Sequence, residues 1–248
     1  MILTNPKLVI SIVSHCNGDI ILNLLGDLSK LDYSGFSSVK IIITQNIPEM
    51  VDYSDFGLPV ILQINKYPLG FGDNHNQAFK KTQSDLFVVL NPDIRIMDKF
   101  NFSSFVLPLE DKYELVSPLI YSPDMKIEDS FRKYPSIFRL IKRYFSSSRS
   151  SDYETSLLSY SDILPVDWVA GMFMVFSSRA FNRISGFDTK YFMYLEDADI
   201  CKRINRGGEK VGIVGSEYAM HDARRKTFKN LQHFTWHTRS MIRFIFRC

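Results

Sequence analysis

The clearest structural signal in the chain is the segment Phe87-Val88-Val89-Leu90-Asn91-Pro92-Asp93. Its four apolar residues lead directly into an Asn-Pro turn, a pattern typical of a buried strand that ends abruptly. Strands buried on both faces belong to parallel sheets that helices cover on both sides. Ligands of open α/β sheets bind at the carboxyl ends of such strands. We therefore expect the carboxylate of Asp93 at a binding site, on a turn that the ring of Pro92 stiffens.

The residues before this segment alternate between strand and helix patterns. Strands are expected over residues 8–13, 39–44 and 59–64. An amphipathic helix is expected from Asp19, which can cap it, and a second helix after the glycine-bearing loop 66–72. This alternation favours a doubly wound, mostly parallel α/β sheet. A Rossmann dehydrogenase would share the alternation, but no G-x-G-x-x-G pattern follows the first strand.

The second half of the chain is less regular. Residues 115–120 and 165–177 have strand-like sequences, whereas the apolar side chains of 129–145 follow a helical spacing. The serine-rich residues 146–151 are expected to form a loop. Residues 227–247 show helical periodicity, with one apolar side and one basic side. The apolar side is formed by Phe234, Met241, Phe244 and Ile245, and the basic side by Arg239, Arg243 and Arg247.

Composition narrows the class of protein. The 248 residues carry a net charge of +3, which alone does not indicate a nucleic-acid partner, and no base-reading motif is present. Cys16, Cys201 and Cys248 are scattered and odd in number, which favours a reducing compartment over a disulfide framework. No apolar run approaches the ~18 residues that a spanning helix needs. We expect a cytoplasmic protein.

Three carboxylates cluster in Glu196-Asp197-Ala198-Asp199, at an expected helix start. There the helix dipole stabilises negative charge. Helical spacing places Asp197 on the apolar face of this helix and lets Asp199 pair with Arg203. A carboxylate at the rim of an apolar face tends to have a raised pKa, which suits a general base. Simple helix capping with an i, i+4 ion pair explains the same cluster equally well.

Several short motifs occur together in one order along residues 8–221. They are Gly70-Phe71-Gly72 with Asn76, Asn91-Pro92-Asp93, Trp168-Val169-Ala170-Gly171, Gly186-Phe187-Asp188, the segment from Tyr194 to Arg203, and His221. This order resembles the family-2 inverting glycosyltransferases with a GT-A fold, in particular the bacterial rhamnosyltransferase-like branch of O-antigen and lipopolysaccharide biosynthesis. The resemblance implies a GT-A domain over residues 1–226, followed by a basic amphipathic helix over 227–248.

The resemblance also implies roles for the site residues. Asp93 and His221 would hold Mg²⁺ or Mn²⁺ on the diphosphate of a nucleotide sugar. Asp197 would be the catalytic base, and Glu196 would orient the acceptor. Trp168 and Gly171 would line the acceptor pocket. The donor would contact Asn17, Asn46, Gly70, Phe71, Gly72, Asn76, Asn91 and Asp93.

The expected reaction moves L-rhamnose from dTDP-β-L-rhamnose to a saccharide on a polyprenyl diphosphate. A UDP-hexose or UDP-galactofuranose donor stays open, because Gln45-Asn46 replaces the family's usual Asp-Asn pair. A catalytically silent saccharide-binding or scaffold protein also stays open, because Asn91 stands where many relatives carry an aspartate.

Two basic, aromatic segments, 129–145 and 227–248, suggest attachment to the inner face of the bacterial inner membrane. Packing of 227–248 against the catalytic domain is the alternative. His75 is expected either to contact phosphate or simply to belong to a polar helix start. His233 and His237 have a metal-binding spacing, but no third ligand is evident and a surface position is expected.

Overall fold

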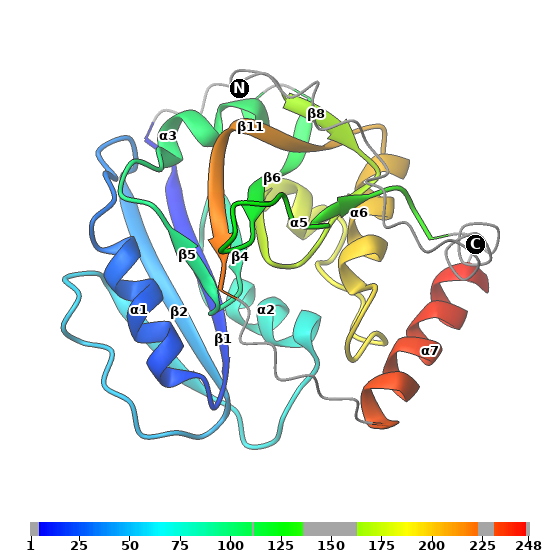
Figure 1. The fold of residues 1–248 in the computed structure, drawn as a ribbon, viewed down its shortest axis with the longest axis horizontal. Helices are drawn as coiled ribbons and strands as arrows, with labels where there is room; N and C mark the ends of the chain where they lie inside the picture. Colours follow the sequence, from blue (N-terminus) through cyan, green and yellow to red (C-terminus); the bar gives the residue numbers. More distant parts are fainter. Residues whose placement is uncertain (1–4, 111, 136–162, 223–230, 247–248) are drawn as a thin grey trace.

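The computed structural model describes residues 5–110, 112–135, 163–222 and 231–246. Half of its central sheet is parallel, with the strands β1 (Lys7–His15), β2 (Ser38–Ile47), β3 (Val60–Ile64) and β4 (Leu86–Leu90). They lie in the order β3-β2-β1-β4, and every residue of β4 is buried. Because Leu8–Ile12 pairs in parallel with Leu86–Leu90, β4 ends beside the end of β1. The predicted strands and their parallel arrangement are confirmed (Figure 1).

The remaining strands make the sheet mixed. The strand β10 (Phe173–Ser177) lies between β4 and β6 (Tyr113–Tyr121) and is antiparallel to both. Next comes β11 (Lys210–His221), parallel to β6, and its two ends pair with β8 (Ile163–Val166) and β5 (Ile94–Ile96). A separate ribbon joins β7 (Phe131–Arg132) to β9 (Trp168–Val169). Within 129–145, the apolar residues with the predicted helical spacing fall in 137–145, which lie outside the described residues, so that helix stays a prediction.

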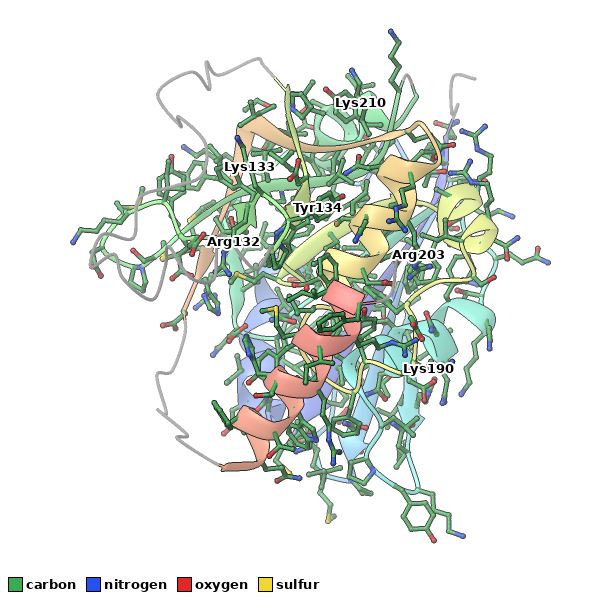
Figure 2. The ribbon with its side chains drawn as sticks, turned by 90° about the vertical axis from the view of Figure 1, so that its right-hand side faces the viewer. Arg132, Lys133, Tyr134, Lys190, Arg203 and Lys210 are labelled. Atoms are coloured by element: carbon green, nitrogen blue, oxygen red, sulfur yellow. The ribbon has the colours of Figure 1, made fainter. Side chains whose placement is uncertain are left out.

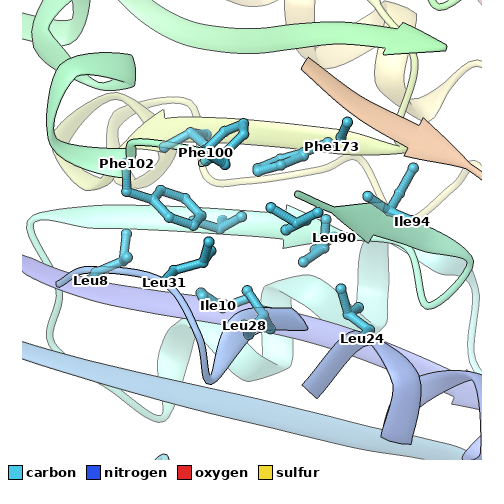
Figure 3. Packing of buried hydrophobic residues seen from close by; sticks show 14 of the residues in the cluster. Leu8, Ile10, Leu24, Leu28, Leu31, Leu90, Ile94, Phe100, Phe102 and Phe173 are labelled. Atoms are coloured by element: carbon cyan, nitrogen blue, oxygen red, sulfur yellow. The ribbon is translucent and has the colours of Figure 1, made fainter. Parts of the chain in front are cut away.

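Helices cover both faces of the sheet, as Figure 1 shows. They are α1 (Gly18–Leu28), α2 (Phe71–Lys80), α3 (Phe102–Phe105), the 3₁₀ turn η1 (Leu107–Glu110), α5 (Ser178–Arg183), α6 (Glu196–Arg206) and α7 (Leu231–Phe246). One apolar cluster packs α1 against β1 and β4 and continues on the other side of β4 with Phe100, Phe102 and Phe173 (Figure 3). A second cluster packs α6 against the opposite face. Fully burying each large apolar side chain contributes roughly 1.5–3 kcal/mol, so the two clusters hold the strand ends in fixed places.

The start of α1 differs from the prediction. The N-cap residue is Asn17, without a side-chain capping bond, and Asp19 lies exposed in the first turn. Instead, Glu49 accepts a hydrogen bond from the Gly18 amide at 3.0 Å, and its other oxygen bonds the Ser14 hydroxyl. A carboxylate from the loop after β2 thus caps α1, which local sequence does not reveal.

One side of α7 packs on the body of the molecule. Phe244 is buried, the Ser240 hydroxyl donates to the Met193 carbonyl at 2.9 Å, and Arg243 pairs with Asp188 at 2.7 Å. The predicted grouping of Phe234 with Phe244 is wrong, since Phe234 is 69% exposed. No helix among the described residues has the length and apolar character to cross a bilayer. The predicted division at 226/227 falls in the undescribed residues 223–230 and stays a prediction.

Candidate active site

The turn after β4 and the end of β11 meet at one edge of the sheet. The Asn91 amide donates to the Met172 carbonyl at 2.9 Å, which fixes the turn against the start of β10. Ile94 then pairs with His221, and this register places Asp93 Oδ2 at 3.2 Å from His221 Nε2. Two side chains 128 positions apart, both predicted as metal ligands, are thus brought together.

Glu128 is a member of this site that the sequence analysis missed. One of its carboxylate oxygens lies 2.8 Å from Nδ1 of His221, on the side of the ring opposite Asp93. Burial alone would lower the pKa of His221, but the hydrogen bonds to Asp93 and Glu128 outweigh it and raise the pKa to about 9. No sequence motif surrounds Glu128. Its position follows from the chain turning back beside Tyr121, where Ile127 forms an isolated bridge.

The Asp93–His221 pair suits a divalent cation that also binds phosphates. The second oxygen of Asp93, Oδ1, is buried without a hydrogen-bond partner. Carboxylate oxygen and imidazole nitrogen are ligands for Mn²⁺, and Mg²⁺ also accepts a carboxylate with several waters and substrate phosphates. Within the described ranges, no three His, Cys, Asp or Glu side chains surround one point. Two protein ligands leave positions open for a diphosphate.

Asp197 lies in the first turn of α6, partly buried, and two amides hold its carboxylate. Gly171 N–H donates to Oδ2 at 3.1 Å, and Ala198 N–H donates to Oδ1 at 2.8 Å. Burial raises the pKa of Asp197, whereas these amides and the charge of Arg132 act in the opposite direction. The predicted rim position of Asp197 and the Asp199–Arg203 pair, at 2.8 Å, are both present.

Glu196 is the more buried of the two adjacent carboxyls, at 6% exposure, and its Oε2 has no hydrogen-bond partner. Burial, together with the neighbouring Asp197, raises the pKa of Glu196 to about 8. Two adjacent carboxyls that share a site favour one proton between them. The deeper burial of Glu196 favours the proton on that carboxyl, which makes Asp197 the candidate for the anion that a base must be.

The acceptor-side residues are close packed. Trp168 is only 5% exposed, its indole N–H donates to the Lys133 carbonyl at 3.1 Å, and the Arg132 guanidinium lies 5.4 Å from the ring centroid. Little of the indole is therefore available for a sugar to stack on. In Figure 2, Arg132, Lys133 and Tyr134 lie on one side of the upper end of α7 and Arg203 on the other. The sequence analysis did not assign Arg132, which lies over this tryptophan, to the pocket.

The three glycines predicted at the site make close contacts within the protein. A Cβ on Gly70 would meet the backbone of Phe192, and one on Gly72 would meet the Phe187 side chain. At Gly171, it would meet the Phe71 ring at 2.9 Å. These glycines let the start of α2 lie against residues 187–192 and 171. Their observed role is close backbone approach, and their donor contacts stay a prediction.

The predicted donor-binding asparagines are also held internally. Asn76 bonds both backbone groups of Phe187, at 2.8 and 2.9 Å. Asn46 bonds both backbone groups of Leu69, at 2.9 and 2.8 Å. Asn17 lies half-buried at the start of α1, where its amide N–H donates to Ser14 Oγ at 3.1 Å. The amides of Asn46 and Asn76 thus hold the backbone of Leu69 and Phe187, and their donor contacts stay a prediction.

Three further histidines make contacts within the protein. His75 is buried, its Nδ1 lies 2.8 Å from Ser11 Oγ, and burial lowers its pKa to about 3. A neutral, enclosed ring does not suit phosphate binding, so the structure favours the packing alternative. His233 Nδ1 lies 2.8 Å from Tyr194 Oη, and the His237 ring centroid lies 5.5 Å from that of Tyr194. The i, i+4 pair therefore contacts a tyrosine.

Comparisons with known proteins identify relatives of this chain. The chain matches no family model. It is 30% identical to the rhamnosyltransferase WbbL of Escherichia coli K12, over 96% of this chain and 92% of that protein. It is 26% identical to the N-acetylglucosaminyl-diphospho-decaprenol L-rhamnosyltransferase of Mycobacterium tuberculosis, over 73% of this chain and 62% of that protein.

A solved structure shows the same fold. GalNAc-T7 with UDP, GalNAc and Mn²⁺ superposes with a TM-score of 0.66, covering 91% of this chain and 45% of that one. At 12% identity this likeness establishes the GT-A architecture and nothing finer. Together with the extent of the WbbL match, it shows that the chain belongs to the rhamnosyltransferase-like branch of the family-2 glycosyltransferases.

Proposed function

We propose that this glycosyltransferase is metal-dependent and inverting, and that it moves L-rhamnose from dTDP-β-L-rhamnose to a saccharide on a polyprenyl diphosphate. One observation carries the proposal. The neighbouring residues Gly171 and Met172 link the Asp93 turn to Asp197. The Met172 carbonyl accepts the hydrogen bond of the Asn91 amide, and the Gly171 amide donates to the Asp197 carboxylate. A donor held at Asp93 therefore lies close to the carboxylate that can activate an acceptor. The names of the two rhamnosyltransferase relatives support the sugar, and the mycobacterial name supports the lipid diphosphate.

The proposal gives each residue a step. Asp93 and His221 would hold a divalent cation, which supplies Lewis-acid neutralisation of the leaving diphosphate. Asp197 accepts the proton of the acceptor hydroxyl as that oxygen forms its bond to the anomeric carbon. The bond from that carbon to the phosphate oxygen breaks, and its electron pair leaves with dTDP. Protonated Glu196 donates a hydrogen bond that orients the acceptor. Attack from the face opposite dTDP inverts the configuration.

Substitution of the base tests this assignment. Asp197→Asn keeps the size of the side chain but cannot take a proton, so turnover should fall by at least about 10²-fold. Binding of dTDP should stay as in the wild type. Asp199→Asn is the matched control, because Asp199 lies two positions further on and pairs with Arg203. Full turnover by Asp197→Asn would refute the base assignment.

Substitution at the cation site tests the donor side. Asp93→Ala should abolish the dependence of dTDP binding on Mn²⁺, as measured by calorimetry with and without a chelator. Turnover of dTDP-rhamnose, UDP-hexoses and UDP-galactofuranose by the wild type decides the donor, and NMR of the product decides the anomeric outcome. Absence of turnover with every donor, with metal and lipid acceptor present, would favour the silent scaffold.

The outward side of α7 supports attachment to the inner membrane. Phe234, Ile242 and Phe246 recur at i, i+8 and i+12 and are 69%, 54% and 74% exposed. Arg239 is exposed beside them, which suits an anionic lipid surface. Replacing the three apolar residues by serine should release the protein from phosphatidylglycerol vesicles without unfolding it. Unchanged binding in a flotation assay would refute this attachment.

A further inference from the structure

We infer that Glu128 is a positioning residue of the cation site, which holds the His221 ring so that Nε2 faces Asp93 and a divalent cation. The inference rests on the proposed metal dependence and adds a residue that no motif of the chain marks. Glu128 does not itself point at the cation position. It acts through the imidazole.

The geometry around the ring is two-sided. Glu128 lies 2.8 Å from Nδ1 and Asp93 lies 3.2 Å from Nε2. Where a cation takes the place of the hydrogen on Nε2, the hydrogen on Nδ1 stays bound to Glu128, so the ring turns its Nε2 lone pair toward Asp93 and the cation. With a single partner, the ring could rotate about its side-chain bonds. The second contact fixes its plane, and all three side chains are at least partly buried, which limits competition from water.

The backbone that carries Glu128 is itself anchored. Its amide donates to the Ile120 carbonyl at 2.7 Å, and its carbonyl accepts from Ser130 at 2.7 Å. Ser130 in turn accepts from the Ala170 amide at 2.7 Å. Ala170 precedes Gly171, whose amide holds Asp197. The segment from Glu128 to Ser130 therefore contacts the cation side through a side chain and the base side through its backbone.

Mn²⁺ affinity of the full chain, measured by electron paramagnetic resonance with and without dTDP, tests this role. Loss of a carboxylate that holds a ligating histidine typically costs 10–100-fold in metal affinity, and we expect this for Glu128→Ala. Glu128→Gln keeps an acceptor oxygen for Nδ1–H and should lose clearly less. Asp124→Ala is the control, since Asp124 lies in the same connection after β6 but is exposed and pairs weakly with Lys126 at 3.9 Å.

A double substitution separates positioning from charge. In a His221→Ala background, Glu128→Ala should cause no further loss, because Glu128 acts only through the ring. If Glu128→Ala lowers Mn²⁺ affinity in the His221→Ala background as much as it does in the wild type, the positioning role is refuted. It is also refuted if Glu128→Ala binds Mn²⁺ with wild-type affinity while Asp93→Ala and His221→Ala bind it more weakly. If Asp93→Ala and His221→Ala both bind Mn²⁺ as the wild type does, the proposed cation site fails and the inference fails with it.

Discussion

Replacing Glu196 by glutamine should change how the stability of the protein depends on pH. Burial and the adjacent Asp197 raise the Glu196 pKa from its ordinary 4.5 to about 8. The folded protein therefore holds a proton on this carboxyl that the unfolded chain releases near pH 4.5. By linkage, the stabilising contribution of the protonated group is complete below pH 4.5 and is lost as the pH rises through about 8. The gap between the two values corresponds to on the order of 5 kcal/mol.

Urea unfolding of the wild type and Glu196→Gln between pH 5 and pH 9 measures this contribution. Glutamine resembles the protonated acid in shape but cannot ionise, so the variant should gain several kcal/mol relative to the wild type across that range. Asp98→Asn is the control, because its carboxyl is 73% exposed in the folded protein and pairs only loosely with Lys30. Its stability should follow the wild-type curve at every pH.

Parallel stability curves for the wild type and Glu196→Gln would refute the reasoning, since they would mean that Glu196 is ionised in the folded state. The same ionisation should appear in catalysis. The wild-type kcat/KM should fall above about pH 8 as Glu196 loses the proton with which it orients the acceptor. That alkaline fall should be absent in Glu196→Gln.

Three further substitutions or treatments test the architecture. Gly186→Ala should lower the free energy of unfolding by roughly 2–4 kcal/mol, because Gly186 has a φ of +65° and an added Cβ would collide with the Asn76 amide. Gly208→Ala is the control, because Gly208 has a φ of +87° but open space around it, and it should cost only about 1 kcal/mol. Urea unfolding measures both. Phe244→Ala should expose α7 to limited proteolysis and lower turnover, because loss of this buried side chain costs roughly 3–5 kcal/mol of stability. Phe246→Ala should have neither effect, because the side chain of Phe246 is 74% exposed. A chelator should abolish turnover, with restoration by Mn²⁺; activity that persists in chelator would contradict the cation site.

Local patterns predicted the parallel half of the fold because the evidence for those strands lies within each segment. The apolar run before Asn91 and the helical spacing after Glu196 depend on neighbours a few positions away. The insertion of β10 between β4 and β6 depends on pairing between segments far apart. Strand periodicity gives no direction, so this antiparallel placement was not predictable from it.

The site divides in the same way. The resemblance predicted that Asp93 and His221 lie together, and the pairing of β5 with β11 provides the contact. Glu128 carries no motif, and its role depends on a 2.8 Å contact across 93 positions. The basic side predicted for residues 227–247 is only partly exposed for a related reason. Helical spacing identifies residues that share a face, but not the partner of that face, and Arg243 pairs with Asp188.

The backbone before Glu196 and Asp197 gives α7 a role in holding the proposed site. Tyr194 and Leu195 have φ angles of +73° and +63°, conformations that cost of order 1–3 kcal/mol each in a non-glycine residue. Such a turn persists only when surrounding contacts hold it, and three of these contacts come from α7. They are His233 against Tyr194, Ser240 against Met193, and Trp236 against Phe192.

Because Asp197 lies in the first turn of α6, directly after this strained turn, its position depends on α7 remaining docked. The same helix presents Phe234, Ile242 and Phe246 outward, away from these contacts. A helix that attaches to lipid with one side and holds the turn before Asp197 with the other would bring the proposed base to the membrane surface, where the proposed polyprenyl-linked acceptor would lie. If Phe244→Ala loses turnover on a water-soluble acceptor, α7 acts by holding the turn before Asp197. If it loses turnover only on a vesicle-bound acceptor, α7 acts through its contact with lipid.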